Sequence, residues 1–239
     1  NQEGLNAVID ADEGKTILFG DDITMDHVIW MGEQESLKSL AAKSGIETVL
    51  PAHKIFDHCT RDMHYLPPYR AEHSLRLEQY LDLTELKPSV QLILAIAEQR
   101  NIKSEEEIEE MHLAASLTSK MHELIMRQAK AGMTEYELVA LASKFAWENN
   151  VQWSFTPIMT VNGQTLHNHS YTNTLKRGDL LLYDGGIESP SGYAGDMTRT
   201  MPVSNSFTPL QKDIYQIVVN AHEAARLACK PKVYYKDIH

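Results

Sequence analysis

The sequence of 239 residues contains only two cysteines, Cys59 and Cys229, which lie far apart and lack the close spacing of a zinc site. A disulfide framework is therefore not indicated, and a reducing, cytoplasmic environment is expected. Long hydrophobic runs are missing as well, because no apolar stretch approaches the roughly 20 residues that cross a bilayer. No secretory signal peptide is visible, so the sequence gives no indication of a membrane partner.

Basic charge is also scarce, with 22 Lys and Arg against 33 Asp and Glu and a net charge of −11. Such a chain does not attract a phosphate backbone, so no nucleic-acid partner is expected. Hydrophobic residues make up 43% and charged residues 23%, which excludes a disordered chain. The densest acidic run, residues 105–110, indicates the start of a helix capped by Ser104, because acidic side chains favour that end of the helix dipole.

The sequence pattern changes near residue 100, and two domains are expected, residues 1–102 and 103–239. In the first, short apolar strands alternate with helical segments, which is typical of an α/β domain. The expected strands are 7–10, 16–20 and 47–50, and the expected helices are 36–44, 72–81 and 89–99.

The second domain is predicted to be α+β, with helices packed on one side of a curved antiparallel sheet. A long helix, from about 102 to Gly132, carries apolar residues at three- and four-residue spacing, which predicts one buried stripe: Ile108, Met111, Ala115, Thr118, Met121, Ile125 and Ala129. A second helix is expected after Thr134, with Glu137 in the capping-box position. A strand is expected over 155–161. A third helix, at roughly 209–228, is predicted to direct five residues inward: Ile214, Ile217, Val218, Ala221 and Ala225.

The segment 166–201 carries the clearest functional signal. An apolar strand over 179–184 and a threonine-rich strand over 196–202 flank a Gly/Ser/Pro-rich turn, which predicts a hairpin. Asp184 closes the first strand and Asp196 opens the second, so the hairpin brings both to one end, where paired carboxylates suit a divalent cation. Asp179 lies five residues before Asp184 and therefore points to the other face, as a turn residue. The alternative is that all of them merely cap turns.

The histidines differ in what their positions suggest. His167 lies seventeen residues before Asp184 and offers the proton-handling or oxyanion-contacting group that metal-assisted hydrolysis uses. His169 shares its face if the segment is extended, and is expected to line the pocket wall. His112 and His122 are ten residues apart, too far for a metal pair, and are expected to be surface or hydrogen-bonded core histidines.

Four short motifs follow one another in this part of the sequence: Leu-His at 166–167, Arg-Gly-Asp-Leu at 177–180, Tyr-Asp-Gly-Gly at 183–186 and Gly-Tyr-Ala-Gly-Asp-Met-Thr-Arg-Thr at 192–200. In this order they resemble the core of the aminopeptidase P and prolidase family, metallopeptidases of pita-bread fold that cleave bonds next to proline. The Phe-Thr-Pro-Leu-Gln segment at 207–211 and the helix after it also resemble the family. The resemblance implies a pita-bread (creatinase/aminopeptidase-like) catalytic domain, preceded by a partial α/β amino-terminal domain.

The resemblance also implies roles for individual residues. Asp184 resembles the first metal ligand, and Asp196 resembles the aspartate that bridges two ions. His167 resembles the histidine that contacts substrate and stabilises charge at the scissile carbonyl, and Thr198 resembles a residue that orients a ligand. The implied metal is Mn²⁺, two ions of which activate a shared water in the complete enzyme. The implied partners are proline-containing peptides and a second copy of the chain, as a homodimer.

The sequence departs from the family in one important respect. The family site has five protein ligands, and the histidine and two glutamates that complete it are not found in this sequence, since His239 resembles a helix-entry residue instead. The start, Asn1-Gln2-Glu3-Gly4, leads directly into an apolar strand where the family has further residues. We therefore expect an incomplete domain, truncated at both ends, that binds metal weakly and is inactive by itself.

Three functions remain open at this point. The first is a metal-dependent Xaa-Pro exopeptidase, either an aminopeptidase or a dipeptidase. The second is a creatinase-like enzyme, against which the aspartate pair argues, because creatinase relatives work without metal. The third is a metal-free pita-bread interaction module, against which the intact set of His167, Asp184 and Asp196 argues.

Overall fold

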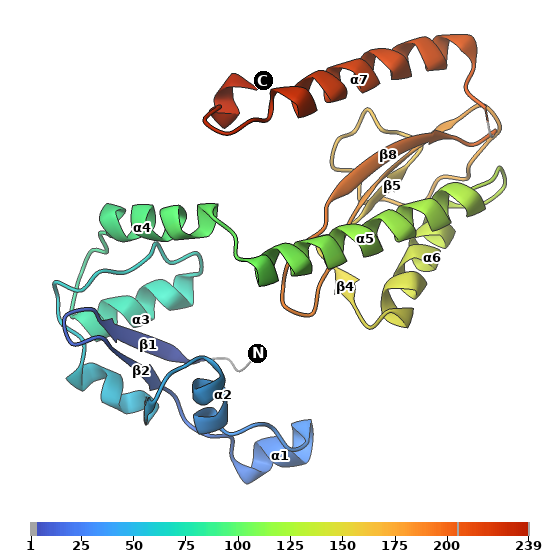
Figure 1. Ribbon diagram of the computed structural model, residues 1–239. Helices are drawn as coiled ribbons and strands as arrows, with labels where there is room; N and C mark the ends of the chain where they lie inside the picture. The colour runs from blue at the N-terminus through green and yellow to red at the C-terminus, as the bar shows by residue number, and fades with distance from the viewer. Residues whose placement is uncertain (1–3, 205, 239) are drawn as a thin grey trace. The chain divides into compact units, whose positions relative to one another are not determined.

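The computed structural model describes residues 4–204 and 206–238 (Figure 1). The chain divides into two compact units, of which the first ends at Ile102 and the second begins at Lys103. Across the described ranges, no helix has both the length and the apolar character needed to cross a membrane. The expectations for Asn1, Gln2, Glu3 and His239 lie outside the described residues.

The first unit is a small α/β structure built on a three-stranded sheet. β1 and β2 form an antiparallel hairpin, and β3 pairs parallel to β2. Its elements are β1 (Asn6–Asp10), β2 (Lys15–Phe19), α1 (Met25–Met31), α2 (Leu37–Lys43), β3 (Thr48–Leu50), η1 (Ala52–Asp57), α3 (Ala71–Leu81) and α4 (Val90–Asn101). The predicted strands and helices are confirmed to within two residues, whereas α1 and η1 were not predicted. Phe19, Leu37 and Ala41 are among its buried core residues.

The second unit places helices against a three-stranded antiparallel sheet of order β5-β6-β8, beside a two-stranded pair, β4-β7. Its elements are α5 (Glu105–Gln128), α6 (Glu135–Glu148), β4 (Gln152–Trp153), β5 (Ile158–Thr160), β6 (Leu180–Gly185), β7 (Ile187–Glu188), β8 (Met197–Pro202), α7 (Pro209–Ala228) and η2 (Tyr235–Asp237). Both α5 and α6 contact the sheet (Figure 1).

Local sequence signals account for where these helices begin. Ser104 and Glu107 form a reciprocal capping box at the start of α5, and Thr134 and Glu137 do so at α6. Each box satisfies backbone N–H groups that the first helical turn leaves without partners. Both predicted caps are confirmed. The strand expected over 155–161 is shorter than predicted, because β5 includes only Ile158–Thr160.

The core of the second unit lies between the helices and one face of the sheet. Alternate residues of β6, Leu181 and Tyr183, are fully buried, as the period-two geometry of a strand requires. The apolar residues that they pack with include Met121, Ile125, Leu138, Ala142, Met159 and Met201. The opposite face of β6, which carries Leu182 and Asp184, is only half-buried.

The predicted stripe on α5 is partly wrong. The buried residues are Ala114, Thr118, Met121, His122 and Ile125. Ala115 is exposed, Ile108 and Met111 are each 44% exposed, and Ala129 caps the helix instead of belonging to it. The stripe is shifted toward His122 because polar residues there contact the backbone of the sheet, which apolar periodicity does not reveal.

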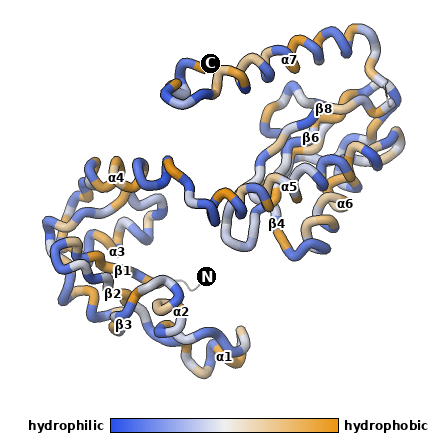
Figure 2. Tube along the Cα trace, viewed as in Figure 1, coloured by the Kyte–Doolittle hydropathy of each residue, from blue (hydrophilic) through white to orange (hydrophobic). Residues whose placement is uncertain are grey.

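The prediction for α7 is right about the helix and wrong about its burial. The bounds agree, but no α7 residue is buried, and Ile214, Ile217 and Val218 are 56%, 63% and 62% exposed. Ala221 is exposed and Ala225 half-buried. Figure 2 shows apolar and polar residues alternating along the helix. The spacing defines an apolar face, but it does not specify the partner that would cover it.

Candidate metal centre

A single long hairpin carries both predicted metal ligands. β6 and β8 pair antiparallel from Leu180 opposite Pro202 to Gly185 opposite Met197, which confirms the predicted pairing. The same register continues beyond the strands, where the N–H of Gly195 donates to the Ile187 carbonyl at 2.7 Å. This part of the hairpin, residues 184–187 and 195–198, is called the hairpin mouth below.

The register determines how the two aspartates relate. Asp184 lies directly opposite Thr198. Asp196 is two residues before Thr198, so it is the diagonal neighbour of Asp184 on the same face. Diagonal neighbours have Cα atoms about 7–8 Å apart, a separation from which two carboxylates can reach toward one ion. The hairpin therefore brings Asp184 and Asp196 to the same end and the same face of the sheet.

The hydrogen bonds distinguish Asp184 from Asp179. Thr198 Oγ1 donates to Asp184 Oδ1 at 2.8 Å, which orients that carboxylate across the ladder. Asp179 Oδ2 instead accepts from the backbone N–H of Lys176 at 2.8 Å, within the turn before β6. The prediction that Asp179 serves the turn is confirmed. Asp196 is exposed, and it has no hydrogen bond within the described ranges.

The donor chemistry of this pair suits a hard divalent cation but does not complete a site. Carboxylate oxygens are the ligands that Mg²⁺, Ca²⁺ and Mn²⁺ prefer. However, residues 4–204 and 206–238 contain no cluster of three or more His, Cys, Asp or Glu side chains placed to hold a metal ion. Asp184 and Asp196 could therefore supply two carboxylate ligands, which is only part of the ligand set of a metal centre.

The loop after β5 folds back over the face that carries Asp184. Asn168 Nδ2 donates to Thr160 Oγ1 at 3.1 Å. A Cβ added to Gly163 would lie 3.1 Å from a methyl of Leu182. Leu182 is opposite Thr160 and two residues before Asp184, so both contacts are on the face of Asp184.

His167 lies in this loop, next to Asn168. Its side chain is exposed, and it makes no hydrogen bond or ion pair to any described residue. The segment forms a turn at His167 and is not a strand, so the strand alternation considered for His167 and His169 does not apply. The structure thus places His167 on the loop that covers the face of Asp184, without a hydrogen bond or ion pair to Asp184 or Asp196.

A buried carboxylate fastens both ends of that loop, a feature that the sequence reasoning missed. Glu135, the first residue of α6, is fully buried. It accepts hydrogen bonds from the backbone N–H of Val161 at 2.9 Å and of Asn173 at 3.0 Å. The Asn173 amide also donates to it at 3.0 Å. The loop between Val161 and Asn173 therefore has a common anchor at its two ends.

The helix side of the hairpin mouth carries buried polar groups. His122 Nε2 donates to the Gly185 carbonyl at 3.0 Å, and its ring stacks on Tyr183 with centroids 4.0 Å apart. Burial lowers the pKa of His122 below its ordinary value, while the Gly185 carbonyl opposes this shift. Burial also raises the pKa of Tyr183, and the charge of Asp184 adds to that effect. The expectation of a hydrogen-bonded core histidine is confirmed for His122.

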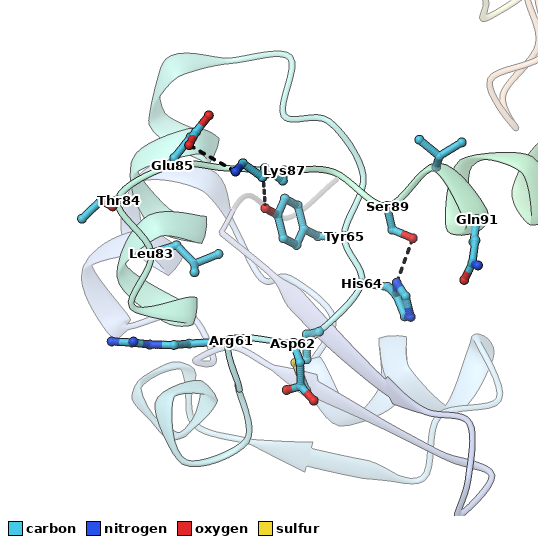
Figure 3. Close-up of a pocket in the computed structure, with 12 residues that line it drawn as sticks. Arg61, Asp62, His64, Tyr65, Leu83, Thr84, Glu85, Lys87, Ser89 and Gln91 are labelled. Carbon is cyan, nitrogen blue, oxygen red and sulfur yellow. Dashed lines mark hydrogen bonds and ion pairs between the residues drawn. The ribbon is translucent and has the colours of Figure 1, made fainter.

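A cavity of about 580 Å³ lies elsewhere, in the first unit (Figure 3). Its polar groups bond to one another. His64 Nδ1 lies 2.8 Å from Ser89 Oγ, which caps α4, and the Tyr65 hydroxyl accepts from the N–H of Lys87 at 2.5 Å. The side chain of Lys87 pairs with Glu85 at 3.4 Å. Because these groups are satisfied internally, the cavity offers no set of converging reactive side chains.

Comparison with known proteins decides the family. Residues 109–239, more than half of the chain, match the model of metallopeptidase family M24. The chain belongs to metallopeptidase family M24. Residues 1–67 match the aminopeptidase P N-terminal domain. The chain therefore has part of the α+β pita-bread fold of this family. Part of an N-terminal domain precedes it.

Individual relatives agree with this assignment. The chain is 27% identical to a Homo sapiens Xaa-Pro dipeptidase, over 100% of this chain and 51% of the relative. It is 30% identical to Xaa-Pro aminopeptidase 3 of Rattus norvegicus, over 88% and 44%. Aminopeptidase P from E. coli, in a low-pH form, superposes with a TM-score of 0.77 and 26% identity, over 88% of this chain and 52% of that one. The chain thus spans about half the length of the curated relatives it matches.

Proposed function

We propose that this chain contributes the carboxylate pair and the substrate-contacting histidine of a metal-dependent exopeptidase that cleaves the bond between an N-terminal residue and proline. The observation that carries the proposal is the hairpin mouth, where Asp184 and Asp196 share one end and one face of the β6–β8 ladder. The loop of His167 lies over that same face, as the contacts of Asn168 and Gly163 indicate.

Each residue has a distinct role in this proposal. Asp184 would hold the metal with a carboxylate that the Thr198 hydroxyl keeps in orientation. Asp196 would hold it with an exposed carboxylate on the same face. His167 stabilises the negative charge that develops on the scissile carbonyl. When bound, the metal, which we propose to be Mn²⁺, supplies an activated water as nucleophile.

We propose two domains, residues 1–102 as a partial amino-terminal domain and 103–239 as the amino-terminal part of the catalytic domain. The division of the structure between Ile102 and Lys103 supports this boundary. We propose that Asp184 and Asp196 form only part of the ligand set of the metal centre, and that the chain is inactive by itself. A cytoplasmic location and a homodimer belong to the same proposal.

The chain resembles both aminopeptidases and a dipeptidase. The dipeptidase match extends over the whole chain, so Xaa-Pro dipeptidase activity is the second candidate. A metal-free interaction module would need no carboxylate pair, and the exposed Asp196 beside an oriented Asp184 argues against it.

Metal binding at the hairpin mouth can be measured on the chain as it is. Adding Mn²⁺ to the ¹⁵N-labelled protein should broaden backbone amide signals first at 184–186 and 195–198, because the paramagnetic ion relaxes nearby nuclei. Asp184→Asn should lower the Mn²⁺ affinity, measured from this localised broadening, by about tenfold or more, since it removes a charged ligand. The matched control is Asp179→Asn, which alters a carboxylate of the same hairpin committed to the turn.

Broadening centred on the acidic run at 105–110, with none at the hairpin mouth, would refute the proposed site. Hydrolysis of Xaa-Pro peptides should be absent for the chain alone, with or without Mn²⁺. Rapid, metal-dependent hydrolysis would instead show that two carboxylates suffice, and would overturn the proposal that ligands are missing.

A further inference from the structure

Helix α5 contacts the hairpin mouth at two glycines, each of which adjoins one of the proposed ligands. Gly185 follows Asp184, and its carbonyl accepts from His122 Nε2 at 3.0 Å. Gly195 precedes Asp196, and a Cβ built on it would lie 2.2 Å from Thr118 Oγ1. The helix therefore contacts the backbone beside both carboxylates.

Thr118 also makes a hydrogen bond to the hairpin mouth. Its Oγ1 accepts from the backbone N–H of Ile187 at 3.0 Å. Ile187 is the residue whose carbonyl accepts from Gly195, so this hydroxyl bonds to a residue of the ladder that continues beyond the two carboxylates. Thr118 and His122 are four residues apart and therefore project from the same face of α5, about 6 Å apart along its axis.

Both side chains are buried to 1% exposure, among apolar neighbours such as Met121 and Ile125. Hydrophobic packing alone does not explain why position 122 is a histidine. Its Nδ1 is buried without a hydrogen-bond partner among the described residues, and an unsatisfied buried polar atom costs about 1–3 kcal/mol. An apolar ring would fill the same space and stack on Tyr183 without that cost, but it would lose the bond to Gly185.

We propose that Thr118 and His122 are positioning residues, which fix the backbone on either side of the hairpin mouth and so set the separation of the Asp184 and Asp196 carboxylates for metal binding. Neither residue touches the metal. They act on the ligands through Gly185, Ile187 and Gly195. This inference rests on the proposed metal site and adds the elements that hold it.

Two matched pairs of variants test the inference in the Mn²⁺ titration. His122→Phe keeps the ring and its stacking but removes the N–H, and should weaken Mn²⁺ binding by about ten- to a hundredfold, the range typical of residues that hold ligands in place. His122→Gln retains an N–H donor and should restore the affinity to within about threefold of the original protein. Thr118→Val and Thr118→Ser form the corresponding pair for the hydroxyl. Thr118→Val removes the hydroxyl and should weaken Mn²⁺ binding, whereas Thr118→Ser keeps it and should retain the affinity.

A general loss of stability must be separated from a positioning effect. Ile125→Val, on the same helix and also fully buried, should cost about 0.5–1.5 kcal/mol of stability and leave the Mn²⁺ affinity unchanged. All titrations are made where the amide spectrum shows a folded second unit. If His122→Phe does not fold, the Thr118→Val and Thr118→Ser pair decides.

The outcomes separate the two proposals. Unchanged Mn²⁺ affinity in both His122→Phe and Thr118→Val, with binding intact in the original protein, would overturn the positioning role and leave the metal site standing. An equal loss in Ile125→Val would also overturn it. Absence of localised Mn²⁺ broadening in the original protein would overturn the metal site itself, and the positioning role with it.

Discussion

Replacing Gly186 by alanine should prevent the hairpin mouth from closing. A Cβ on Gly186 would lie 1.8 Å from the carbonyl oxygen of Gly195 and 2.6 Å from Ser154 Oγ. The carbonyl belongs to the backbone, so the clash cannot be relieved by a side-chain rotation. Relief requires the strands to separate, which breaks the bond from Gly195 N–H to Ile187 and the bond from Ser154 Oγ to the Gly195 carbonyl.

We expect Gly186→Ala to lower the free energy of unfolding of the second unit by about 3 kcal/mol or more, the upper end of overpacking effects. Urea unfolding followed by tryptophan fluorescence measures this, because the Trp153 indole is half-buried beside Gly185, whereas Trp30 and Trp147 are already exposed. The matched control is Ser191→Ala in the exposed turn of the same hairpin, which should change stability by less than about 0.5 kcal/mol. A Gly186→Ala protein as stable as this control would contradict the close approach of the two strands.

Local signals in the sequence predicted most of the elements of this fold. Capping boxes defined the starts of α5 and α6, and the bounds of α7 were correct to the residue. The hairpin followed from two apolar or threonine-rich strands around a glycine-rich turn, and its register places Asp184 and Asp196 at one end as expected. These features are encoded in contiguous stretches of sequence, so they can be predicted without tertiary information.

The remaining features depend on contacts between segments that are distant in the sequence. The stripe on α5 was predicted correctly at Thr118, Met121 and Ile125, but His122 was left out. His122 is buried because it contacts the backbone of Gly185, 63 residues away. The prediction that α7 is buried was wrong, because apolar spacing defines a face of the helix but does not determine which segment packs against it. The sequence did contain a signal for the burial of His122. Thr118 and His122 are four residues apart and interrupt an otherwise apolar face of α5.

The loop of His167 illustrates the same limit at the proposed site. Its sequence predicted neither the turn nor the face that it covers. Its position depends on Asn168 reaching Thr160 and on the anchoring of its ends by Glu135, a residue 26 positions before Val161. Glu135 looked like an ordinary first-turn glutamate in a helix start, where acidic residues are common, so nothing in the local pattern distinguished it.

Removing the Glu135 carboxylate should therefore release the loop and destabilise the second unit. In Glu135→Leu, the N–H groups of the half-buried Val161 and Asn173 lose their acceptor, at about 1–3 kcal/mol each. We expect a total loss of about 2–5 kcal/mol in the free energy of unfolding, and faster hydrogen exchange at the amides of 161–173. Glu135→Gln keeps one acceptor oxygen but turns an N–H₂ group toward these donors, so an intermediate loss is expected.

Hydrogen exchange followed by mass spectrometry distinguishes a local anchor from a general core residue. Glu148→Gln, at the exposed end of the same helix, removes only a surface ion pair with Lys144 and should change stability by less than about 1 kcal/mol. If Glu135→Leu accelerates exchange uniformly over the second unit, without an excess in 161–173, the carboxylate contributes to global stability alone. A selective excess there means that the position of the His167 loop over the face of Asp184 depends on the buried Glu135 side chain, which binds both ends of the loop.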